Sequence, residues 1–261
     1  MSFNVVIPAR YDSQRLPGKP LKDIHGKTLI QRVYEQARAS DAQNVIVATD
    51  DERIASHVRS FGGRVTMTSA HHVSGTDRVF EVCRLEDMPA DAIVVNVQGD
   101  EPLIPPAVIN QVAENLVLHQ VAAATLGESF VTDRDLFNPG IVKAVHDATG
   151  RAIYFSRAPV PWIRDHYPQD STQLKTLGEM DRVDRDGSVL RHLGIYAYRV
   201  SLLSNFVQWD EAPLERLEKL EQLRILWNGA SIHIEAACQS FPQGVDTQED
   251  LERVRAWLKN P

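Results

Sequence analysis

The alternation of short apolar runs with stretches of helical period most constrains how this chain can fold. Within the first hundred residues, runs rich in Val and Ile predict four strands, at 5–7, 45–48, 64–67 and 93–97. Between the first three of them, the stretches 29–37 and 54–61 place their apolar residues on one helical face. Strand–helix–strand units of this kind form parallel sheets with helices on both faces. The pattern therefore predicts an α/β fold in which ligands bind beyond the carboxyl ends of the strands.

The later part of the chain is patterned less regularly. We expect a helix at 106–119, strands at 121–126, 142–146, 152–155, 192–198 and 231–237, and a last helix at 247–258. The stretch 213–227 predicts one long amphipathic helix that ends before Asn228 and Gly229. By contrast, 162–188 is charged and aperiodic, which is typical of a long surface loop. No linker separates two independent domains, so we expect a single domain spanning 1–261.

Charge and cysteine content narrow the class of protein. The formal net charge of −7 argues against broad binding to nucleic acid or to an anionic membrane, because such partners usually require a positive surface. Cys83 and Cys238 lie in apolar segments without metal-ligand spacing, which indicates buried thiols in a reducing compartment. The sequence shows neither a signal-peptide pattern nor a membrane span. We therefore expect a cytoplasmic protein.

The loop after the first predicted strand carries the strongest chemical signal. Within ten residues of this otherwise acidic chain it presents Arg10, Arg15 and Lys19, and its prolines and Gly18 favour a bent, non-helical path. Arginine supplies paired donors and lysine a compact charge to phosphate oxygens. The loop matches neither the P-loop nor the dinucleotide fingerprint. Convergence of three cations at a sheet edge favours a triphosphate site over a solvated basic loop.

A second signal is the segment 96–102, Asn-Val-Gln-Gly-Asp-Glu-Pro, which follows a very apolar strand. Asp100 is well placed there to hold Mg²⁺ against phosphate oxygens, because magnesium prefers one or two carboxylates together with phosphates and water. An exposed turn acid before a helix explains the same residue equally well. Spacing alone does not decide between these interpretations.

Six segments taken together resemble the CMP-Kdo synthetases, the 3-deoxy-manno-octulosonate (Kdo) cytidylyltransferases. The matching segments are 8–21, 74–78, 96–102, 154–157, 192–196 and 244–247, so the resemblance spans nearly the whole chain. It implies transfer of a cytidylyl group from CTP to Kdo for lipopolysaccharide biosynthesis, with dependence on Mg²⁺, and a homodimer. It also implies a Rossmann-like mixed, mainly parallel sheet with a smaller lobe, as in nucleotide-diphospho-sugar transferases. In that organisation the nucleotide-binding part is about 1–125, the sugar-binding and dimerisation part about 126–230, and the C-terminal strand and helix return to the main sheet.

The resemblance also assigns roles to individual residues. The nucleotide would be bound by Arg10, Arg15, Lys19, Ser74, Gly75 and Arg78. The metal would be held by Asp100 and Asp246, and the catalytic residues would be Lys19, Asp100 and Arg10. The sugar acid would contact Gln98, Arg157, His192, Tyr196, Glu221 and Gln222, with Arg157 facing the carboxylate. Taken singly, the acceptor residues are as well explained by core packing or by a solvated helix face. His71 and His72 receive no role.

Asp246 has a competing structural interpretation. The run 246–249, Asp-Thr-Gln-Glu, predicts an N-cap with a glutamate three residues later. Capping alone would then account for the aspartate.

Other functions remain open from the sequence. Sialic acid or an amino analogue of Kdo could replace Kdo as the acceptor. A hexose-1-phosphate nucleotidyltransferase would normally show a GxGxR loop, where this chain has Pro8-Ala9-Arg10. A non-catalytic nucleotide-binding module would need the basic loop but not the acceptor residues or the paired acids.

Overall fold

A computed structural model describes residues 1–13, 15–72, 74–130, 133–164, 167, 187 and 189–259. The chain divides into two compact units. Unit 1 comprises 1–123, 194–208 and 238–261, and unit 2 comprises 124–193 and 209–237. Most of the surface loop predicted at 162–188 lies outside the described residues.

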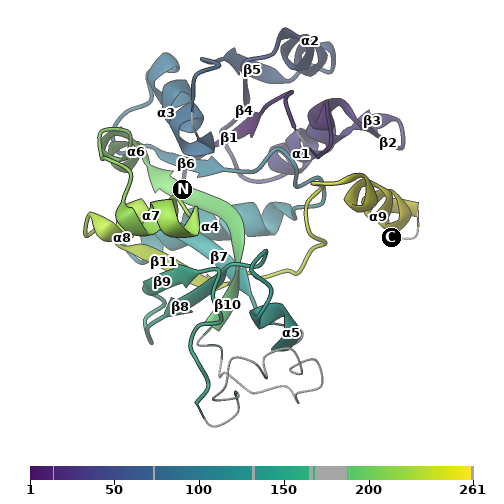
Figure 1. The fold of residues 1–261 in the computed structure, drawn as a ribbon. Coiled ribbons are helices and arrows are strands. Elements are labelled where there is room, and N and C mark those ends of the chain that lie inside the picture. Colours follow the sequence, from purple (N-terminus) through teal and green to yellow (C-terminus); the bar gives the residue numbers. More distant parts are fainter. Residues whose placement is uncertain are drawn as a thin grey trace. The chain divides into compact units, whose positions relative to one another are not determined.

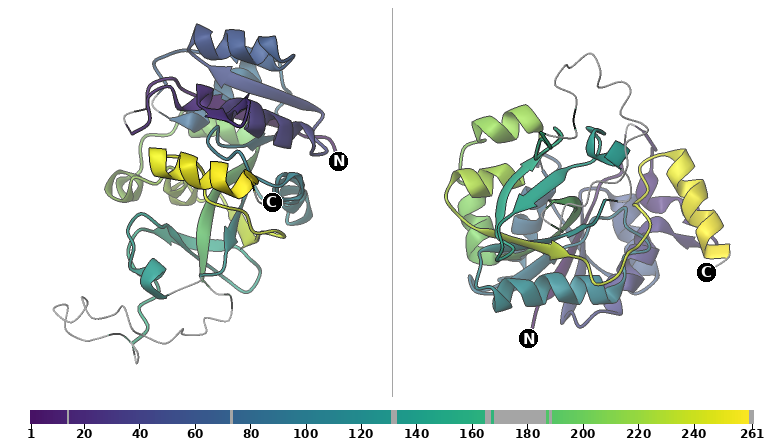
Figure 2. Two further views of the ribbon diagram at one scale, coloured as in Figure 1. Left: turned by 90° about the vertical axis from the view of Figure 1, so that its right-hand side faces the viewer. Right: turned by 90° about the horizontal axis from the view of Figure 1, so that it is seen from below.

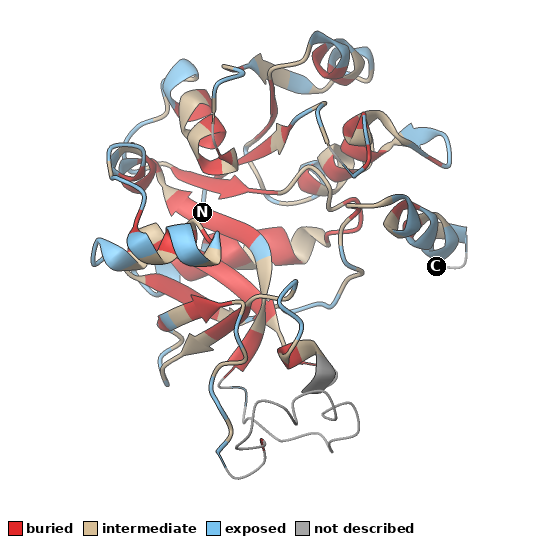
Figure 3. Ribbon diagram, in the orientation of Figure 1, coloured by how far each residue is buried: buried red, intermediate tan, exposed pale blue. Residues whose placement is uncertain are grey.

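Unit 1 contains the parallel part of the sheet (Figure 1). Its strands are β1 (Asn4–Ala9), β4 (Asn44–Thr49), β5 (Arg64–Met67), β6 (Ile93–Asn96) and the end of β10 (Val189–Arg199). They lie in the order β10-β6-β1-β4-β5, with β10 antiparallel to β6 and the other pairs parallel. The side chains of β1, β4 and β6 are almost all buried, which is why the apolar runs predicted these strands (Figure 3). The mixed, mainly parallel sheet is confirmed.

Helices and a short hairpin complete unit 1. The helices are α1 (Leu29–Arg38), α2 (Glu52–Ser60), α3 (Gly75–Leu85), α4 (Pro106–Leu118), α6 (Val200–Phe206) and α9 (Gln248–Lys259), and a 3₁₀ turn spans Lys19–Leu21. The hairpin joins β2 (Asp23–Ile24) to β3 (Lys27–Thr28). In Figure 2, left, the yellow α9 lies beside the purple N-terminal part of the chain. There Arg255 donates to the carbonyl of Asp23, so the last helix is tied to the hairpin.

Unit 2 is built mainly on antiparallel strands. They are β7 (Ala123–Glu128), β8 (Lys143–His146), β9 (Ala152–Ser156), the beginning of β10, and β11 (Ile232–Ala236), in the order β11-β7-β10 with β8 beside β10 and β9 beside β8. The β10–β8 and β8–β9 pairs are antiparallel. Its helices are α5 (Asp133–Leu136), α7 (Pro213–Glu218) and α8 (Gln222–Trp227). A small core forms around Phe130, Leu136, Tyr167 and Val189.

The prediction of a single long helix at 213–227 is wrong. The chain forms α7 and α8 instead, separated at Lys219, whose φ of 54° lies in the left-handed region. The apolar pattern misled because Leu217 is 80% exposed, whereas Glu215 is buried. Glu215 accepts from the backbone N–H of Ala212 and from Arg224 of α8, so a buried ion pair joins the two helices.

The cysteine prediction is half confirmed. Cys83 is buried, and burial raises the pKa of its thiol to about 12, whereas Cys238 is exposed. Cys238 lies two residues after the end of β11, which is why its segment resembles a buried strand in sequence. Among the described residues, no helix combines the length and the apolar character needed to cross a membrane.

Candidate active site

The loops after β1 and β6 meet at the carboxyl edge of the unit 1 sheet. A Cβ at Gly99 would lie 2.6 Å from the carbonyl oxygen of Pro8. The two loops can therefore approach this closely only because Gly99 has no side chain. The cleft between them is lined by Pro8, Ala9, Arg10, Asp12, Ser13, Lys19, Pro20, Gln98, Gly99 and Asp100. The two strongest sequence signals therefore form one site.

Lys19 lies between two carboxylates in this site. Its Nζ is 2.7 Å from Oδ2 of Asp100 and 3.0 Å from Oδ1 of Asp246. Burial alone would lower the pKa of Lys19, but the carboxylates, above all Asp100, outweigh burial and raise it above its ordinary value. The ammonium therefore stays charged through the physiological range. Arg15, which is mostly exposed, lies 3.0 Å from the other oxygen of Asp246.

Asp246 reaches this position from the segment before α9, and it does not cap that helix. Thr247 and Asp250 form the cap: the Thr247 hydroxyl accepts from the N–H of Asp250, and the Asp250 carboxylate accepts from the N–H of Thr247. The competing interpretation of Asp246 as an N-cap is therefore wrong. The N–H of Val245 donates to the carbonyl of Asp100 at 2.8 Å, which fixes the segment beside the other acid.

The two acids fit a magnesium ion. One cation, the Lys19 ammonium, already contacts an oxygen of each carboxylate, so both side chains can converge on a single positive charge. Carboxylate oxygens are the protein ligands that Mg²⁺ prefers, with phosphate and water completing its shell. The metal assignment of Asp100 and Asp246 nonetheless remains a prediction.

The loop after β1, which we call the phosphate loop for its predicted ligand, is held in place by several contacts. Arg10 donates to the carbonyls of His72 and Ser74, at 2.8 and 3.2 Å. The Gly18 N–H donates to the carbonyl of Tyr11, and the Arg53 guanidinium lies 3.3 Å from the centre of the Tyr11 ring. Of the three loop cations, Arg15 and Lys19 meet at Asp246, while Arg10 connects the loop to the start of α3.

The residues predicted at the start of α3 have structural roles. The Ser74 hydroxyl caps α3 by accepting from the N–H of Asp77, and the Asp77 carboxylate accepts from the N–H of Ser74. Arg78 is fully buried, with its guanidinium donating to Thr68 and pairing with Asp50 at 2.9 Å. These contacts orient the helix N-terminus, where a Cβ at Gly75 would lie 3.8 Å from Cγ of Pro8. Nucleotide binding by Ser74, Gly75 and Arg78 remains a prediction.

The acceptor candidates divide between the units. Unit 1 holds Gln98, which donates to the carbonyl of Gly194 at 3.2 Å, and Tyr196, whose ring stacks on Tyr198. Unit 2 holds Arg157, His192, Glu221 and Gln222.

Arg157 is the most constrained of the unit 2 candidates. Its N–H donates to the Glu218 carboxylate at 2.9 Å, its Nε to the Glu218 carbonyl at 2.8 Å, and its Nη1 to the Pro139 carbonyl at 3.0 Å. Among the described residues, Nη2 and the second N–H of Nη1 have no hydrogen-bond partner. The edge that these two nitrogens form thus remains for a ligand.

His192 lies against Phe155, with the rings edge to face, and its Nε2 is 3.1 Å from the Thr125 hydroxyl. Burial lowers the pKa of its imidazole to about 3, so the ring is neutral at neutral pH. Gln222 begins α8, and its buried Nε2 has no partner within the described part of the chain. Glu221 immediately precedes it. A neutral imidazole and an amide are suited to hydroxyl groups rather than to a charge.

Sequence patterns missed three residues that shape these sites. Glu218 and Lys143 hold the backbone around Arg157 in unit 2. Glu101 lies behind Asp100 in unit 1, where burial, and then the charge of Asp100, raises the pKa of its carboxyl to about 8. Glu101 was already inside the segment 96–102 identified from the sequence, but nothing in its spacing marked it as buried. Lys143 lies in an ordinary strand pattern, and Glu218 lies on a polar helix face.

Comparison with known proteins gives a consistent result. The cytidylyltransferase family model matches residues 4–232. A 3-deoxy-manno-octulosonate cytidylyltransferase of Saccharophagus degradans is 57% identical over 261 residues and covers 100% of both chains. One of Cellvibrio japonicus is 56% identical and covers 99% of both.

Solved structures agree with these sequence matches. CMP:2-keto-3-deoxy-manno-octonic acid synthetase complexed with CTP matches with a TM-score of 0.84 at 40% identity, covering 99% of this chain and 98% of that one. A 4-diphosphocytidyl-2C-methyl-D-erythritol synthase of Anaerococcus prevotii, 12% identical with a TM-score of 0.60 and coverages of 99% and 97%, shares the fold.

Proposed function

This chain belongs to the cytidylyltransferase family, and from that premise we propose that it transfers a cytidylyl group from CTP to the anomeric C2 hydroxyl of Kdo, giving CMP-Kdo and pyrophosphate. The family resemblance of the six sequence segments is thereby confirmed. The observation that carries the proposal is the 57% identity to a Kdo cytidylyltransferase over the full length of both chains.

The proposed reaction is a direct displacement. The C2 hydroxyl oxygen of Kdo attacks the α-phosphorus of CTP, the bond from that phosphorus to the oxygen bridging toward the β-phosphorus breaks, and pyrophosphate leaves. The hydroxyl proton passes to solvent, because none of the described residues of the cleft is an unambiguous general base. The chemistry needs no covalent intermediate on the protein.

The loop cations supply the electrostatics. Arg10 and Lys19 line the cleft, and Arg15 from the same loop pairs with Asp246, which also binds Lys19. Their fixed positive charge would offset the negative charge that develops on the departing pyrophosphate. Lys19 is suited to this role because its amine remains protonated. Arg10 is held by two backbone carbonyls, so it reaches the transition state with little reorganisation.

We also propose that Asp100 and Asp246 hold the Mg²⁺ ion on which the enzyme depends. Bound there, magnesium would polarise the α-phosphate and lower the pKa of the attacking hydroxyl. The support is the donor set: two carboxylates that already share one cation beside the phosphate loop.

For the acceptor, Arg157 would bind the sugar carboxylate through its remaining edge, since a planar guanidinium matches a carboxylate geometrically. The sugar hydroxyls would contact Gln98, His192, Tyr196, Glu221 and Gln222. Arg157→Ala should then raise the KM for the sugar acid at least tenfold while changing the KM for CTP less than twofold, the tenfold figure being roughly the effect of one lost charge-assisted hydrogen bond.

Pyrophosphate release tests the function as a whole. We expect release with CTP only when a keto sugar acid is present, and Kdo to give the highest kcat/KM in a panel that also holds sialic acid and an amino analogue of Kdo. Preference for another acid would reassign the acceptor, and preference for a hexose 1-phosphate would move the chain to another reaction class. CTP binding without turnover on any acceptor would indicate a non-catalytic module.

We also propose a homodimer, which the family resemblance implies, and a cytoplasmic location, which the sequence pattern led us to expect. Sedimentation of the purified protein tests the first. Cell fractionation tests the second.

A further inference from the structure

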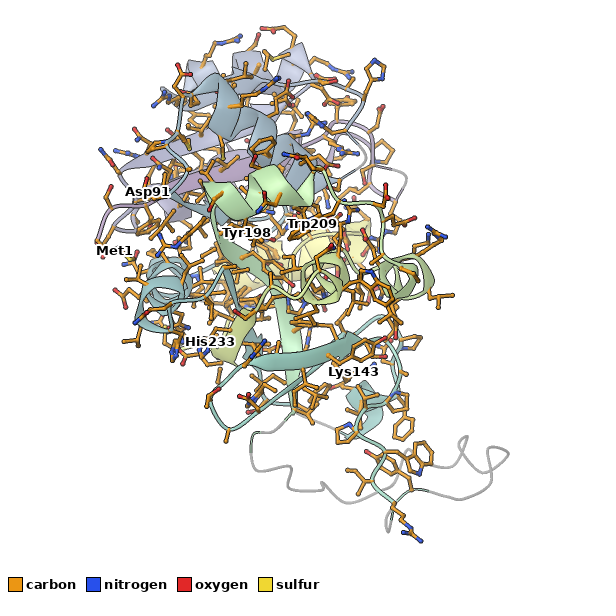
Figure 4. The ribbon with its side chains drawn as sticks, turned by 90° about the vertical axis from the view of Figure 1, so that its left-hand side faces the viewer. Met1, Asp91, Lys143, Tyr198, Trp209 and His233 are labelled. Carbon is orange, nitrogen blue, oxygen red and sulfur yellow. The ribbon has the colours of Figure 1, made fainter. Side chains whose placement is uncertain are left out.

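Lys143 is a fully buried lysine at the start of β8, in unit 2 (Figure 4). Its Nζ lies 2.7 Å from the carbonyl oxygen of Ile141, 3.1 Å from that of Asn138 and 2.5 Å from that of Arg157. A protonated lysine has three N–H donors and no acceptor. Each donor therefore has one carbonyl partner.

This arrangement is costly for a residue that only fills the core. An ammonium removed from water is disfavoured, and burial lowers the pKa of Lys143 to about 8 despite the nearby Glu218 carboxylate. Well-packed apolar residues often stabilise a fold as well as buried charged groups do. A buried cation bound to backbone carbonyls instead fixes where those carbonyls lie.

All three carbonyls bear on the placement of Arg157. One is the carbonyl of Arg157 itself. The others flank Pro139, whose own carbonyl accepts from Nη1 of Arg157. Lys143 thus fixes both the backbone from which the guanidinium extends and the turn against which it rests.

Glu218 holds the same arginine from the other side. Its carboxylate accepts from the Ser156 hydroxyl at 2.6 Å and from the N–H of Arg157, and its carbonyl accepts from Nε. Together the contacts orient the guanidinium so that Nη2 and the second N–H of Nη1 remain as donors.

We propose that Lys143 is a positioning residue for the acceptor: through three backbone carbonyls it aims the Arg157 guanidinium at the carboxylate of the sugar acid. The inference rests on the proposed role of Arg157 in acceptor binding. It assigns to Lys143 no contact with either substrate.

The test replaces Lys143 with methionine, which keeps most of the volume and removes the charge. We expect the KM for Kdo to rise about tenfold or more, because misplacement of a binding group by about 1 Å can cost up to 10²-fold. The KM for CTP should stay within twofold. Val145→Ala, two residues along β8, is the matched control, because Val145 packs against the small core around Phe130 and Val189. It should lower the melting temperature without changing the KM for Kdo. Equal changes in both KM values for Lys143→Met would overturn the proposal.

A double-mutant cycle separates positioning from independent binding. In an Arg157→Ala background, Lys143→Met should leave the KM for Kdo within twofold, because the group that it positions is already absent. If Lys143→Met instead raised the KM for Kdo by its full factor in this background, Lys143 would act independently of Arg157, and the inference would be wrong. If Lys143→Met does not fold, Glu218→Gln, which weakens the opposite side of the same frame, must raise the KM for Kdo selectively, and failure to do so counts equally against it.

The cycle also distinguishes the two levels of the argument. Wild-type protein that releases no pyrophosphate with Kdo contradicts the proposed function. Normal Kdo turnover together with an unchanged KM in Arg157→Ala leaves that function intact and rejects the positioning role.

Discussion

The two units hold their charged residues in opposite ways. In unit 1, Lys19 pairs with the carboxylates of Asp100 and Asp246 at the rim of an open cleft. In unit 2, Lys143 is buried and binds only backbone carbonyls. The pKa of Lys19 is raised and that of Lys143 is lowered, because a full negative charge compensates for desolvation and a carbonyl dipole does so only in part.

This difference indicates which charged contacts a ligand can displace when it binds. Side-chain ion pairs at a surface exchange partners readily, so the unit 1 cluster can open to admit a metal ion and phosphates. Bonds to buried backbone carbonyls cannot exchange without unfolding the turn that carries them. The charged side chains of the unit 1 cluster can therefore change partners on ligand binding, whereas the backbone carbonyls around Lys143 in unit 2 keep their positions.

The largest expected effect comes from removing charge in unit 1 without removing shape. Asp246→Asn should lower kcat at least about 100-fold, because it weakens a proposed magnesium ligand, with partial recovery at raised Mg²⁺. The melting temperature should stay near that of the wild type, since Thr247 and Asp250 cap α9. Thr247→Ala is the control and should lose about 1 kcal/mol of stability while keeping its activity. Full activity of Asp246→Asn at limiting magnesium would show that the paired-acid site is wrong.

A steric change in unit 1 should act on both stability and turnover. A Cβ at Gly244 would lie 2.7 Å from Oε1 of Glu101 and 2.8 Å from the carbonyl oxygen of Asp100. Gly244→Ala must therefore displace the segment that carries Asp246, at a cost of about 1–3 kcal/mol. We expect about a tenfold loss of kcat, measured beside the free energy of unfolding in urea. Wild-type values of both would mean that the rim of unit 1 adjusts more freely than the close contact indicates.

Acid should weaken unit 2 through His192. Its folded-state pKa of about 3 lies below the ordinary value of 6.5, so the unfolded chain binds the proton first. The stability contribution is complete above pH 6.5 and is lost as pH falls toward 3, by up to about 2 kcal/mol at pH 5. His192→Gln should lose less stability than the wild type between pH 7 and pH 5 in urea unfolding. Equal losses would contradict a buried neutral imidazole.

The smallest effects should separate the loop cations by exposure. The side chain of Lys19 is 15% exposed and that of Arg15 is 66% exposed. Lys19→Ala should raise the KM for CTP about tenfold, and Arg15→Ala only two- to fourfold, because solvent screens the outer charge. Neither should change the KM for Kdo more than twofold. If both variants kept the wild-type KM for CTP, the proposal that this loop binds the phosphates would be wrong.

Sequence patterns predicted unit 1 better than unit 2, for physical reasons. A buried parallel strand such as β1 must be apolar on both faces, so its sequence is distinctive. The cations of the phosphate loop are also concentrated in sequence. The break between α7 and α8 was missed because it depends on Lys219 in a left-handed conformation and on the Glu215–Arg224 pair, which no periodicity encodes.

Site residues show the same limit. Asp246 was identified only through the family resemblance, and the local pattern suggested a cap that Thr247 in fact provides. Lys143 occupies a predicted strand, where a lysine is expected to face solvent; its burial depends on carbonyls from 138, 141 and 157, which only the folded chain brings together. Helix α3 was missed although Ser74 and Asp77 have the spacing of a capping box.

The Lys19 ammonium, which lies between Asp100 and Asp246, would also make the proposed binding of metal and of nucleotide in unit 1 thermodynamically interdependent. A divalent ion bound by these carboxylates would take the place of the ammonium, whose charge would then be released toward the phosphates. A triphosphate that attracted Lys19 would leave the two acids uncompensated and so increase their affinity for a cation. Each ligand would thus favour the binding of the other by the same free energy, which is reciprocal cooperativity without any movement of the sheet.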